Sequence, residues 1–218
     1  MTTALDYDSA TTGLVVVDPY NDFISDGGKF WGRLREVADR LGTVPNMLLV
    51  LQTARRIGIP VFYAPHHRWR QGSYDGWKYW TPIQQRNERN HAFEDGTWGG
   101  TFRDEFTPIP NEVVGWEHWC SSGFANTDLD LQLKKHGVHR LIVIGALANT
   151  CIDSTVRFAA ELGYAVTLVK DAIASFTWDE MKATLEHSAP NYAEAIVTTE
   201  DLLKRLSPQT RAREPVEG

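Results

Sequence analysis

LIVIGALANTCIDST, residues 141–155, predicts a strand that leads directly into a helix. Residues 141–144 are apolar and mostly β-branched, as in a buried strand, and Gly145 interrupts the run. From Thr150 onward the apolar residues recur at helical spacing. The pattern therefore predicts that Cys151 lies in the first turn of a helix, just beyond the carboxyl end of a strand.

A cysteine in this position is a candidate nucleophile. The free N–H groups and the positive dipole end of a helix N-terminus stabilise a thiolate. The same N–H groups can stabilise an oxyanion that forms on a substrate carbonyl. A small buried core cysteine is an equally good interpretation of Cys151 from its position alone.

A second apolar run, GLVVVDP at residues 13–19, ends in an acidic residue. In an open α/β sheet, ligands bind outside the carboxyl ends of the strands, so Asp18 and Cys151 are expected at one edge. A carboxylate beside a thiol is a suitable base for it. A turn or cap role for Asp18 is the alternative, because aspartate is common in turns.

Strand and helix signals alternate along the chain, as a doubly wound sheet requires. The predicted strands are Leu14–Asp18, Pro60–Tyr63, Glu112–Trp116, Leu141–Ile144, Val166–Val169 and Ala195–Thr198. The predicted helices include residues 44–57, 127–136 and 150–162, each followed by glycine, and one that opens with the capping box at residues 177–180. Right-handed crossovers between these strands predict a mostly parallel sheet.

Composition favours a single enzyme-like domain over residues 1–218, with a loosely ordered tail at residues 207–218. The net charge of −6 and the pI near 5.6 argue against nucleic acid as a partner. We expect no membrane partner, because no apolar run approaches the length of a membrane span. Two cysteines, Cys120 and Cys151, and no N-terminal signal pattern favour a reducing cytoplasm.

The chain resembles the isochorismatase-like cysteine hydrolases. The similarity rests on LVVVD at residues 14–18, SGFANTDL at 122–129, GALANTCIDST at 145–155 and AAELGY at 159–164, in the order and spacing of that family. It extends over about residues 14–203. The resemblance implies an α/β fold, a Rossmann-like three-layer sandwich with a mostly parallel six-stranded sheet. It also implies hydrolysis of a small amide, ureido compound or related molecule.

The usual triad of this family is Asp, Lys and Cys, and the resemblance assigns its first and last members to Asp18 and Cys151. The family's Lys lies six residues before the Phe of the Ser-x-Phe motif, which is His118 in this sequence. Histidine can carry a positive charge or shuttle a proton, so the predicted triad is Asp18, His118 and Cys151. The alternative is that Glu117 faces the site, because strand alternation lets only one of the two neighbours point inward.

No metal or cofactor is expected. Nicotinamidase-type relatives carry Asp-x-His after the second strand and bind a divalent ion there. In this chain Ala64 occupies the Asp position, and only His66 matches the histidine. Adjacent histidines such as His66 and His67 do not form a chelating pair on one face, so a structural or substrate-contacting role for His66 is favoured.

Aromatic residues are frequent in the long segment 65–111 and near the predicted site. Packing or an oligomer interface explains any one of them, while together they predict an apolar pocket for a flat, ring-bearing substrate. The predicted substrate-binding residues are Phe23, His66, Trp77, Trp80, Trp119 and Phe176. The resemblance also implies a homodimer or homotetramer.

The predicted function is a cysteine-dependent hydrolase that cleaves a C–N bond through a thioester, with a ureido compound, an amide or an isatin-like lactam as substrate. The resemblance implies an oxyanion hole formed by the backbone N–H groups of Leu147 and Cys151, with a cis peptide bond between Ala146 and Leu147. Two alternatives remain: an isochorismatase-type enol-ether hydrolase without metal, and a binding protein that kept the fold without catalysis.

Overall fold

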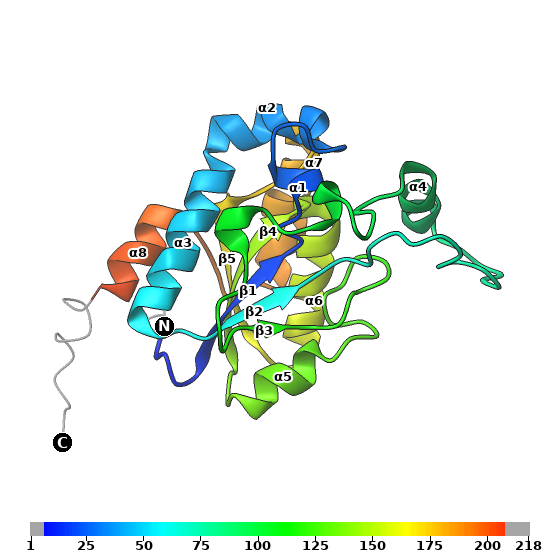
Figure 1. The fold of residues 1–218 in the computed structure, drawn as a ribbon. Coiled ribbons are helices and arrows are strands. Elements are labelled where there is room, and N and C mark those ends of the chain that lie inside the picture. The colour runs from blue at the N-terminus through cyan, green and yellow to red at the C-terminus, as the bar shows by residue number, and fades with distance from the viewer. Residues whose placement is uncertain (1–6, 208–218) are drawn as a thin grey trace, which may run out of the picture.

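The computed structural model describes residues 7–207 and contains one six-stranded sheet in the order β3-β2-β1-β4-β5-β6 (Figure 1). Every strand pair in this sheet is parallel. The strands are β1 (Thr12–Val17), β2 (Val61–Ala64), β3 (Val113–Val114), β4 (Arg140–Ala146), β5 (Ala165–Ala174) and β6 (Ala195–Val197). The predicted three-layer α/β fold with six strands is therefore confirmed.

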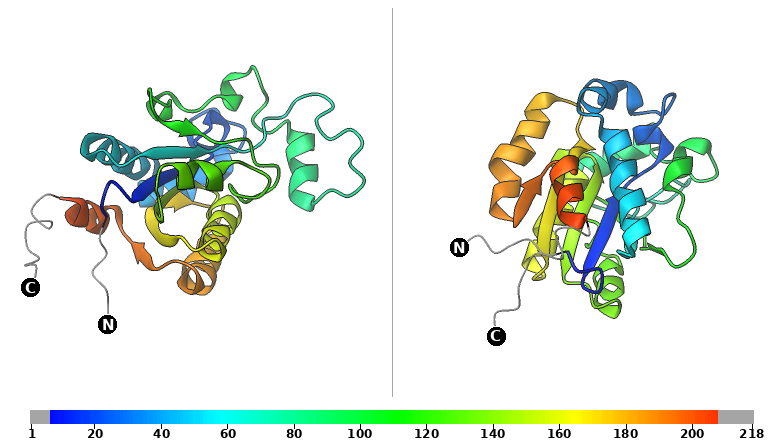
Figure 2. Two further views of the ribbon diagram at one scale, coloured as in Figure 1. Left: turned by 90° about the horizontal axis from the view of Figure 1, so that it is seen from below. Right: turned by 90° about the vertical axis from the view of Figure 1, so that its left-hand side faces the viewer.

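Helices cover both faces of the sheet (Figures 1 and 2). They are α1 (Asn21–Ile24), α2 (Trp31–Leu41), α3 (Thr43–Ile57), α4 (Pro82–Asn90), α5 (Leu129–Lys135), α6 (Asp153–Glu161), α7 (Trp178–Lys182) and α8 (Thr199–Leu206). On one face α2, α3 and α8 pack against β5, while α5 and α6 lie on the other. None of the helices within residues 7–207 is both long and apolar enough to cross a bilayer.

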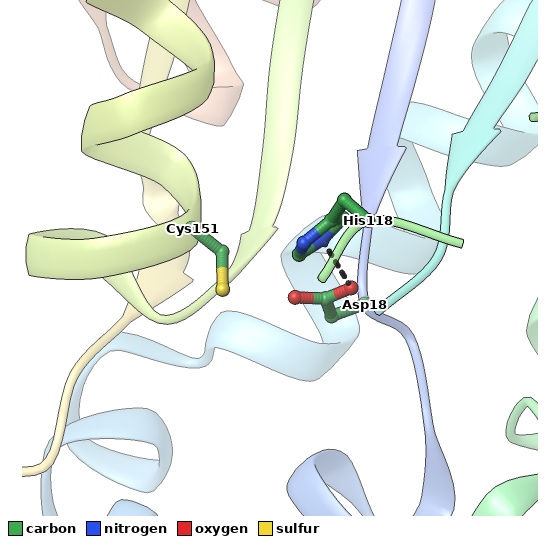
Figure 3. A group of neighbouring side chains, drawn as sticks. All are labelled: Asp18, His118 and Cys151. Atoms are coloured by element: carbon green, nitrogen blue, oxygen red, sulfur yellow. Dashed lines mark hydrogen bonds and ion pairs between the residues drawn. The ribbon is translucent and has the colours of Figure 1, made fainter. Parts of the chain in front are cut away.

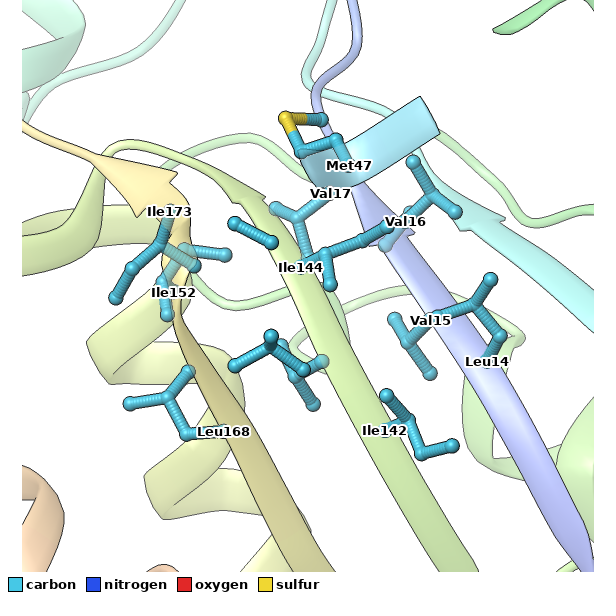
Figure 4. Packing of buried hydrophobic residues seen from close by; sticks show 14 of the residues in the cluster. Leu14, Val15, Val16, Val17, Met47, Ile142, Ile144, Ile152, Leu168 and Ile173 are labelled. Carbon is cyan, nitrogen blue, oxygen red and sulfur yellow. The ribbon is translucent and has the colours of Figure 1, made fainter. Parts of the chain in front are cut away.

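The core explains why the strand sequences read as continuous apolar runs. All residues of β1 are buried, and so are all but the first residue of β4. Because helices cover both faces, alternate side chains on both sides of a parallel strand must be apolar. Figure 4 shows Val15, Val17, Ile144 and Leu168 in this packing, with Met47 of α3 closing over the end of β1.

Differences from the predicted elements are mainly in length. β5 extends to Ala174, five residues beyond the predicted end, whereas β3 contains only Val113 and Val114. The predicted helix at 150–162 begins as a π-helical turn, Ala148–Ile152, before α6 continues it. The capping box at Thr177 is confirmed. Of the predicted tail, residues 208–218 lie outside the described residues.

The long segment after β2 is less irregular than its composition indicates, because it contains α4. Thr81 caps this helix through the backbone N–H of Gln84, and Pro82 occupies its first turn. Figures 1 and 2 show α4 standing out from the body of the molecule on a long excursion of the chain. Asn87 ties α4 back through a 3.0 Å hydrogen bond from its amide to His66 Nε2.

Candidate active site

Asp18 stands at the carboxyl end of β1 and is completely buried. Its backbone adopts φ +52°, a left-handed conformation that few residues other than glycine occupy. The Asp18 N–H donates to the Ala64 carbonyl at 3.3 Å, and the Asp18 carbonyl accepts from Tyr20 at 2.8 Å. The strand thus ends abruptly at this residue, and the carboxylate is fixed at the sheet edge.

Cys151 comes to the same edge from the neighbouring strand, β4. Gly145 lets β4 approach the end of β1, because a Cβ at this position would collide with the Val17 backbone, and its φ of +133° disfavours other residues. The Ala146–Leu147 peptide bond is cis, as expected. The π-helical turn then places the Cys151 side chain, which is buried, beside the end of β1.

His118 approaches from the segment that follows β3. Its N–H donates to the Pro65 carbonyl and its carbonyl accepts from the His67 N–H, both at 2.8 Å, so this part of the chain forms a parallel bridge beside His66. The His118 ring is completely buried, and its Nε2 lies 3.1 Å from Asp18 Oδ1. Of the two neighbouring candidates, His118 is therefore the residue that contacts Asp18.

Glu117 points the other way, as strand alternation requires. Its carboxylate accepts hydrogen bonds from the Nε of Arg68 at 2.6 Å and from Arg70 at 3.0 Å, and lies 3.2 Å from His67 Nδ1. Partial burial raises the pKa of Glu117, but the hydrogen bonds from His67, Arg70 and Arg68 outweigh burial and hold that pKa well below its usual range. Glu117 is thus an ionised partner of arginines.

Asp18, His118 and Cys151 converge (Figure 3). One potential ligand or hydrogen-bonding atom from each lies within 4.8 Å of the others, and all three side chains are buried. Figure 3 shows the Cys151 sulfur turned toward the Asp18 carboxylate, with the His118 ring beside that carboxylate. The three neighbouring side chains thus combine a candidate nucleophile, a candidate base and a candidate proton carrier. Their catalytic roles stay a prediction.

A pocket of about 190 Å³ leads to Cys151. Three of the predicted substrate-binding residues, Phe23, His66 and Phe176, line it. Sequence position gave no signal for the part of the wall that comes from α2 and α4 and from the loop after α4. These additional lining residues include Phe30, Arg33, Arg86, Asn87 and Phe93.

Trp77, Trp80 and Trp119 do not line this pocket, and their role in substrate binding stays a prediction. Trp77 and Trp119 stack on each other with ring centroids 5.4 Å apart, and Trp80 stacks on Tyr74 at 4.9 Å. Trp119 faces a separate groove of about 850 Å³. The loop after β2 carries Trp77 and Trp80 away from the thiol, so these tryptophans pack together outside the Cys151 pocket.

A family model for the isochorismatase domain matches residues 12–201. The chain belongs to the isochorismatase family. It is 32% identical to the isochorismatase family protein YddQ of Bacillus subtilis (strain 168) over 77% of this chain and 79% of that protein. It is 26% identical to the ureidoacrylate amidohydrolase RutB of Rhizobium rhizogenes over 90% of this chain and 83% of that protein.

The fold of this isochorismatase-family chain is similar to the crystal structure of a cysteine hydrolase from Pseudomonas syringae pv. phaseolicola 1448A. The TM-score is 0.75 at 23% identity, and the match covers 92% of this chain and 94% of that one. Membership of the family establishes the fold and the general hydrolase class.

In this isochorismatase-family site, burial and then the negative charge and hydrogen bond of Asp18 raise the pKa of Cys151 well above its ordinary value. The Leu147 backbone hydrogen bond opposes the shift but is smaller. The N-terminus of the helix is expected to stabilise a thiolate at Cys151. In the free protein, burial and the charge of Asp18 outweigh that stabilisation. The raised pKa favours a protonated thiol in the free protein, and the neighbouring Asp18 carboxyl group is placed to accept its proton.

This arrangement predicts opposite effects of Asp18→Asn on chemistry and on thiol reactivity. Removing the carboxylate charge removes a cause that raises the pKa of Cys151, so more thiolate is present at neutral pH. Alkylation of Cys151 by iodoacetamide should become faster in the variant, while turnover falls. Peptide mass spectrometry separates Cys151 from the partly exposed Cys120. Slower alkylation of Cys151 in Asp18→Asn would contradict this assignment of Asp18.

His66 is built into the protein scaffold by both ring nitrogens. Its Nδ1 lies 2.8 Å from the His67 carbonyl oxygen, and its Nε2 lies 3.0 Å from the Asn87 amide nitrogen and 3.1 Å from the Cys120 carbonyl oxygen. Burial, and then the neighbouring His118, lower the pKa of His66 to about 4, so the ring is neutral. With Ala64 lacking a carboxylate, these residues do not fit the metal site of nicotinamidase-type relatives.

Proposed function

We propose that this chain is a cysteine-dependent hydrolase that cleaves the C–N bond of a small amide or ureido compound. The observation that supports the proposal best is the Cys151 thiol beside the Asp18 carboxylate, with His118 hydrogen-bonded to that carboxylate. Cys151 lines a pocket of about 190 Å³, a size that suits a small molecule.

In the first step, Asp18 takes the thiol proton while the Cys151 sulfur attacks the substrate carbonyl carbon. The raised pKa of Cys151 makes this transfer part of the attack, because little thiolate exists beforehand. The carbonyl π electrons move to oxygen. The backbone N–H groups of Leu147 and Cys151 are proposed to stabilise the resulting oxyanion.

In the second step, the C–N bond breaks and the nitrogen leaves with the proton held by Asp18, which leaves an acyl thioester on Cys151. Water then attacks the thioester while Asp18 takes one of its protons. The C–S bond breaks, the sulfur recovers that proton, and the carboxylic or carbamic acid departs. Each proton that Asp18 accepts is returned, so the cycle needs no cofactor.

His118 acts in this scheme through Asp18. Its Nε2 lies 3.1 Å from Asp18 Oδ1, and both side chains are buried, so the ring fixes the orientation of the carboxylate. His118 is proposed to stabilise the Asp18 carboxylate through this hydrogen bond when the thiol proton moves.

The pocket walls, which carry two arginines and one carboxylate, support a flat and acidic substrate. The carboxylate is that of Glu180, which already accepts a hydrogen bond from the Thr177 N–H. Phenylalanine rings provide flat apolar surfaces near Cys151. Arg33 lies with its guanidinium carbon 4.0 Å from the centre of the Phe176 ring, and Arg86 enters the pocket from α4. Neither arginine has a salt bridge to the part of the chain that the structure describes. The name ureidoacrylate, carried by the RutB relative, describes a ureido group and a carboxylate in one small molecule.

Arg86→Met is expected to weaken the binding of acidic substrates selectively. Hydrogen bonds to a charged group contribute about 1.5–3 kcal/mol, so the KM of a ureido acid should rise roughly tenfold or more. The KM of the matched uncharged amide should change little. Arg89→Met is the control, since Arg89 is on the same helix but does not line the pocket. An equal rise in KM for acid and neutral amide would contradict charge recognition.

A substrate panel tests the proposed function directly. Purified protein is offered ureido acids, simple amides, lactams including isatin, and an enol ether of the isochorismate type. Release of ammonia or amine, together with trapping of an acyl group on Cys151 by mass spectrometry, is the expected result. Turnover of the enol ether alone, or binding with no turnover of any compound, would instead support one of the two alternative functions.

A further inference from the structure

Asp18, His118 and Cys151 together form a set of ligands that zinc prefers. Thiolate, imidazole and carboxylate are the three groups that bind Zn²⁺ in proteins. One atom from each residue lies within 4.8 Å of the others, and no other such group occurs among residues 7–207. We propose that this group binds a thiophilic divalent cation, Zn²⁺ or Co²⁺, and that the bound ion blocks the site.

The geometry requires only small movements. Zinc bonds of about 2.0–2.3 Å in a tetrahedron place neighbouring ligand atoms roughly 3.3–3.8 Å apart. Asp18 Oδ1 and His118 Nε2 are already 3.1 Å apart, and the largest separation in the group must close by about 1 Å. Cys151 lines the pocket, so the ion has an entry path and a fourth position open to water.

Two buried polar atoms of the group lack a protein partner. Within the described residues, Asp18 Oδ2 and His118 Nδ1 have no hydrogen bond, although both are shielded from solvent. Buried polar groups are normally paired, because leaving one unpaired costs free energy. The unpaired Asp18 Oδ2 thus gives the group unused capacity for a cation, whereas both ring nitrogens of His66 already have partners.

Charge balance also favours a divalent ion. Binding converts the Cys151 thiol to thiolate and releases its proton to solvent, and the S–H bond is replaced by an S–metal bond. The thiolate and the Asp18 carboxylate then carry two negative charges against two positive ones. A neutral assembly suits this buried position, where an isolated charge would be costly. Thiolate and imidazole select Zn²⁺ and Co²⁺ over Mg²⁺ and Ca²⁺.

The consequence is that metal binding and turnover are mutually exclusive. The ion would occupy both the nucleophile and the base, so the metal-bound protein is inactive and chelation restores it. This is the reverse of a metal cofactor, whose removal lowers activity. The metal proposal itself rests on the geometry of the three side chains, and direct binding tests it whether or not the proposed reaction is correct.

Cobalt titration is the experiment. The full-length protein is stripped with a chelator and titrated with Co²⁺, and visible and near-ultraviolet absorption are recorded. We expect one ion per chain, intense bands of tetrahedral cobalt and a thiolate-to-cobalt charge-transfer band. Cys151→Ser should lose the charge-transfer band, and His118→Lys should weaken Zn²⁺ binding at least tenfold in competition. Cys120→Ser and the surface variant His139→Lys should bind as the parent does.

Two results would overturn the proposal. One is a titration of the parent protein that gives no thiolate-to-cobalt band at millimolar Co²⁺. The other is a band that survives in Cys151→Ser and disappears in Cys120→Ser, which would identify the wrong thiol. Where a substrate from the panel is found, activity lost on chelation and restored by zinc would also contradict inhibition. Failure of the panel with a positive titration would leave the metal site standing and remove only the proposed reaction.

Discussion

Cys151→Ala is expected to abolish turnover while the protein stays folded. Removing the nucleophile of a catalytic triad costs on the order of 10⁶-fold in kcat in a well-studied serine protease. The proposed reaction has no second thiol in position, because Cys120 lines the pocket without contacting Asp18. Single-turnover kinetics on the substrate found in the panel measure the loss, and acyl trapping should fail.

Folding of the variant can be checked independently. Cys151 is buried, so removing its sulfur leaves a small cavity, which costs about 1 kcal/mol in the free energy of unfolding. Thermal unfolding followed by circular dichroism should show a cooperative transition close to that of the parent. Cys120→Ser is the matched control and should retain most of the activity. A Cys151→Ala protein that keeps more than roughly a few per cent of the parent rate would exclude covalent catalysis.

His118→Ala is expected to lower kcat by about 10²–10⁴-fold, the usual contribution of a general acid–base group. The ring holds Asp18 through its Nε2, and its removal leaves the carboxylate buried without that partner. His118→Lys should recover part of the loss if positive charge is the main requirement.

Glu117→Gln is the matched control for His118, since the two residues are adjacent and point to opposite sides. Glu117 pairs with Arg68 and Arg70 outside the thiol pocket, so its amide variant should affect stability more than kcat. An inactive Glu117→Gln together with a fully active His118→Ala would show that this segment is shifted by one residue in the working enzyme. Recovery of activity in His118→Lys distinguishes loss of a charged partner for Asp18 from simple loss of packing.

The sequence alone predicts the fold and the two ends of the candidate site. Local signals suffice for this prediction, because a buried parallel strand must be apolar on both faces. Where the strand leaves the sheet, the apolar run stops and polar residues follow. Asp18 and Cys151 each directly follow such a run, so their place at one sheet edge follows from topology. His118 could be predicted from the motif spacing, and strand alternation left only the choice between it and Glu117.

The pocket walls depended on tertiary structure. Trp77 and Trp80 belong to a loop with no periodic signal, and the path of that loop carries them away from Cys151. Arg33 and Arg86 look like ordinary surface residues of amphipathic helices, yet the docking of α2 and α4 brings both to the pocket. Such contacts join residues far apart in the sequence, and no local pattern encodes which helix face meets which loop.

The state of the thiol also depended on tertiary structure. From its place at the start of a helix, Cys151 is predicted to favour the thiolate, because the N–H groups there attract negative charge. In the folded chain, burial and the Asp18 carboxylate act in the opposite direction and are stronger, so the pKa of Cys151 rises. The sequence determines which groups reach the edge of the sheet. Their burial and the distances between their charges arise only when the strands and helices pack, and burial and these distances decide how the groups ionise.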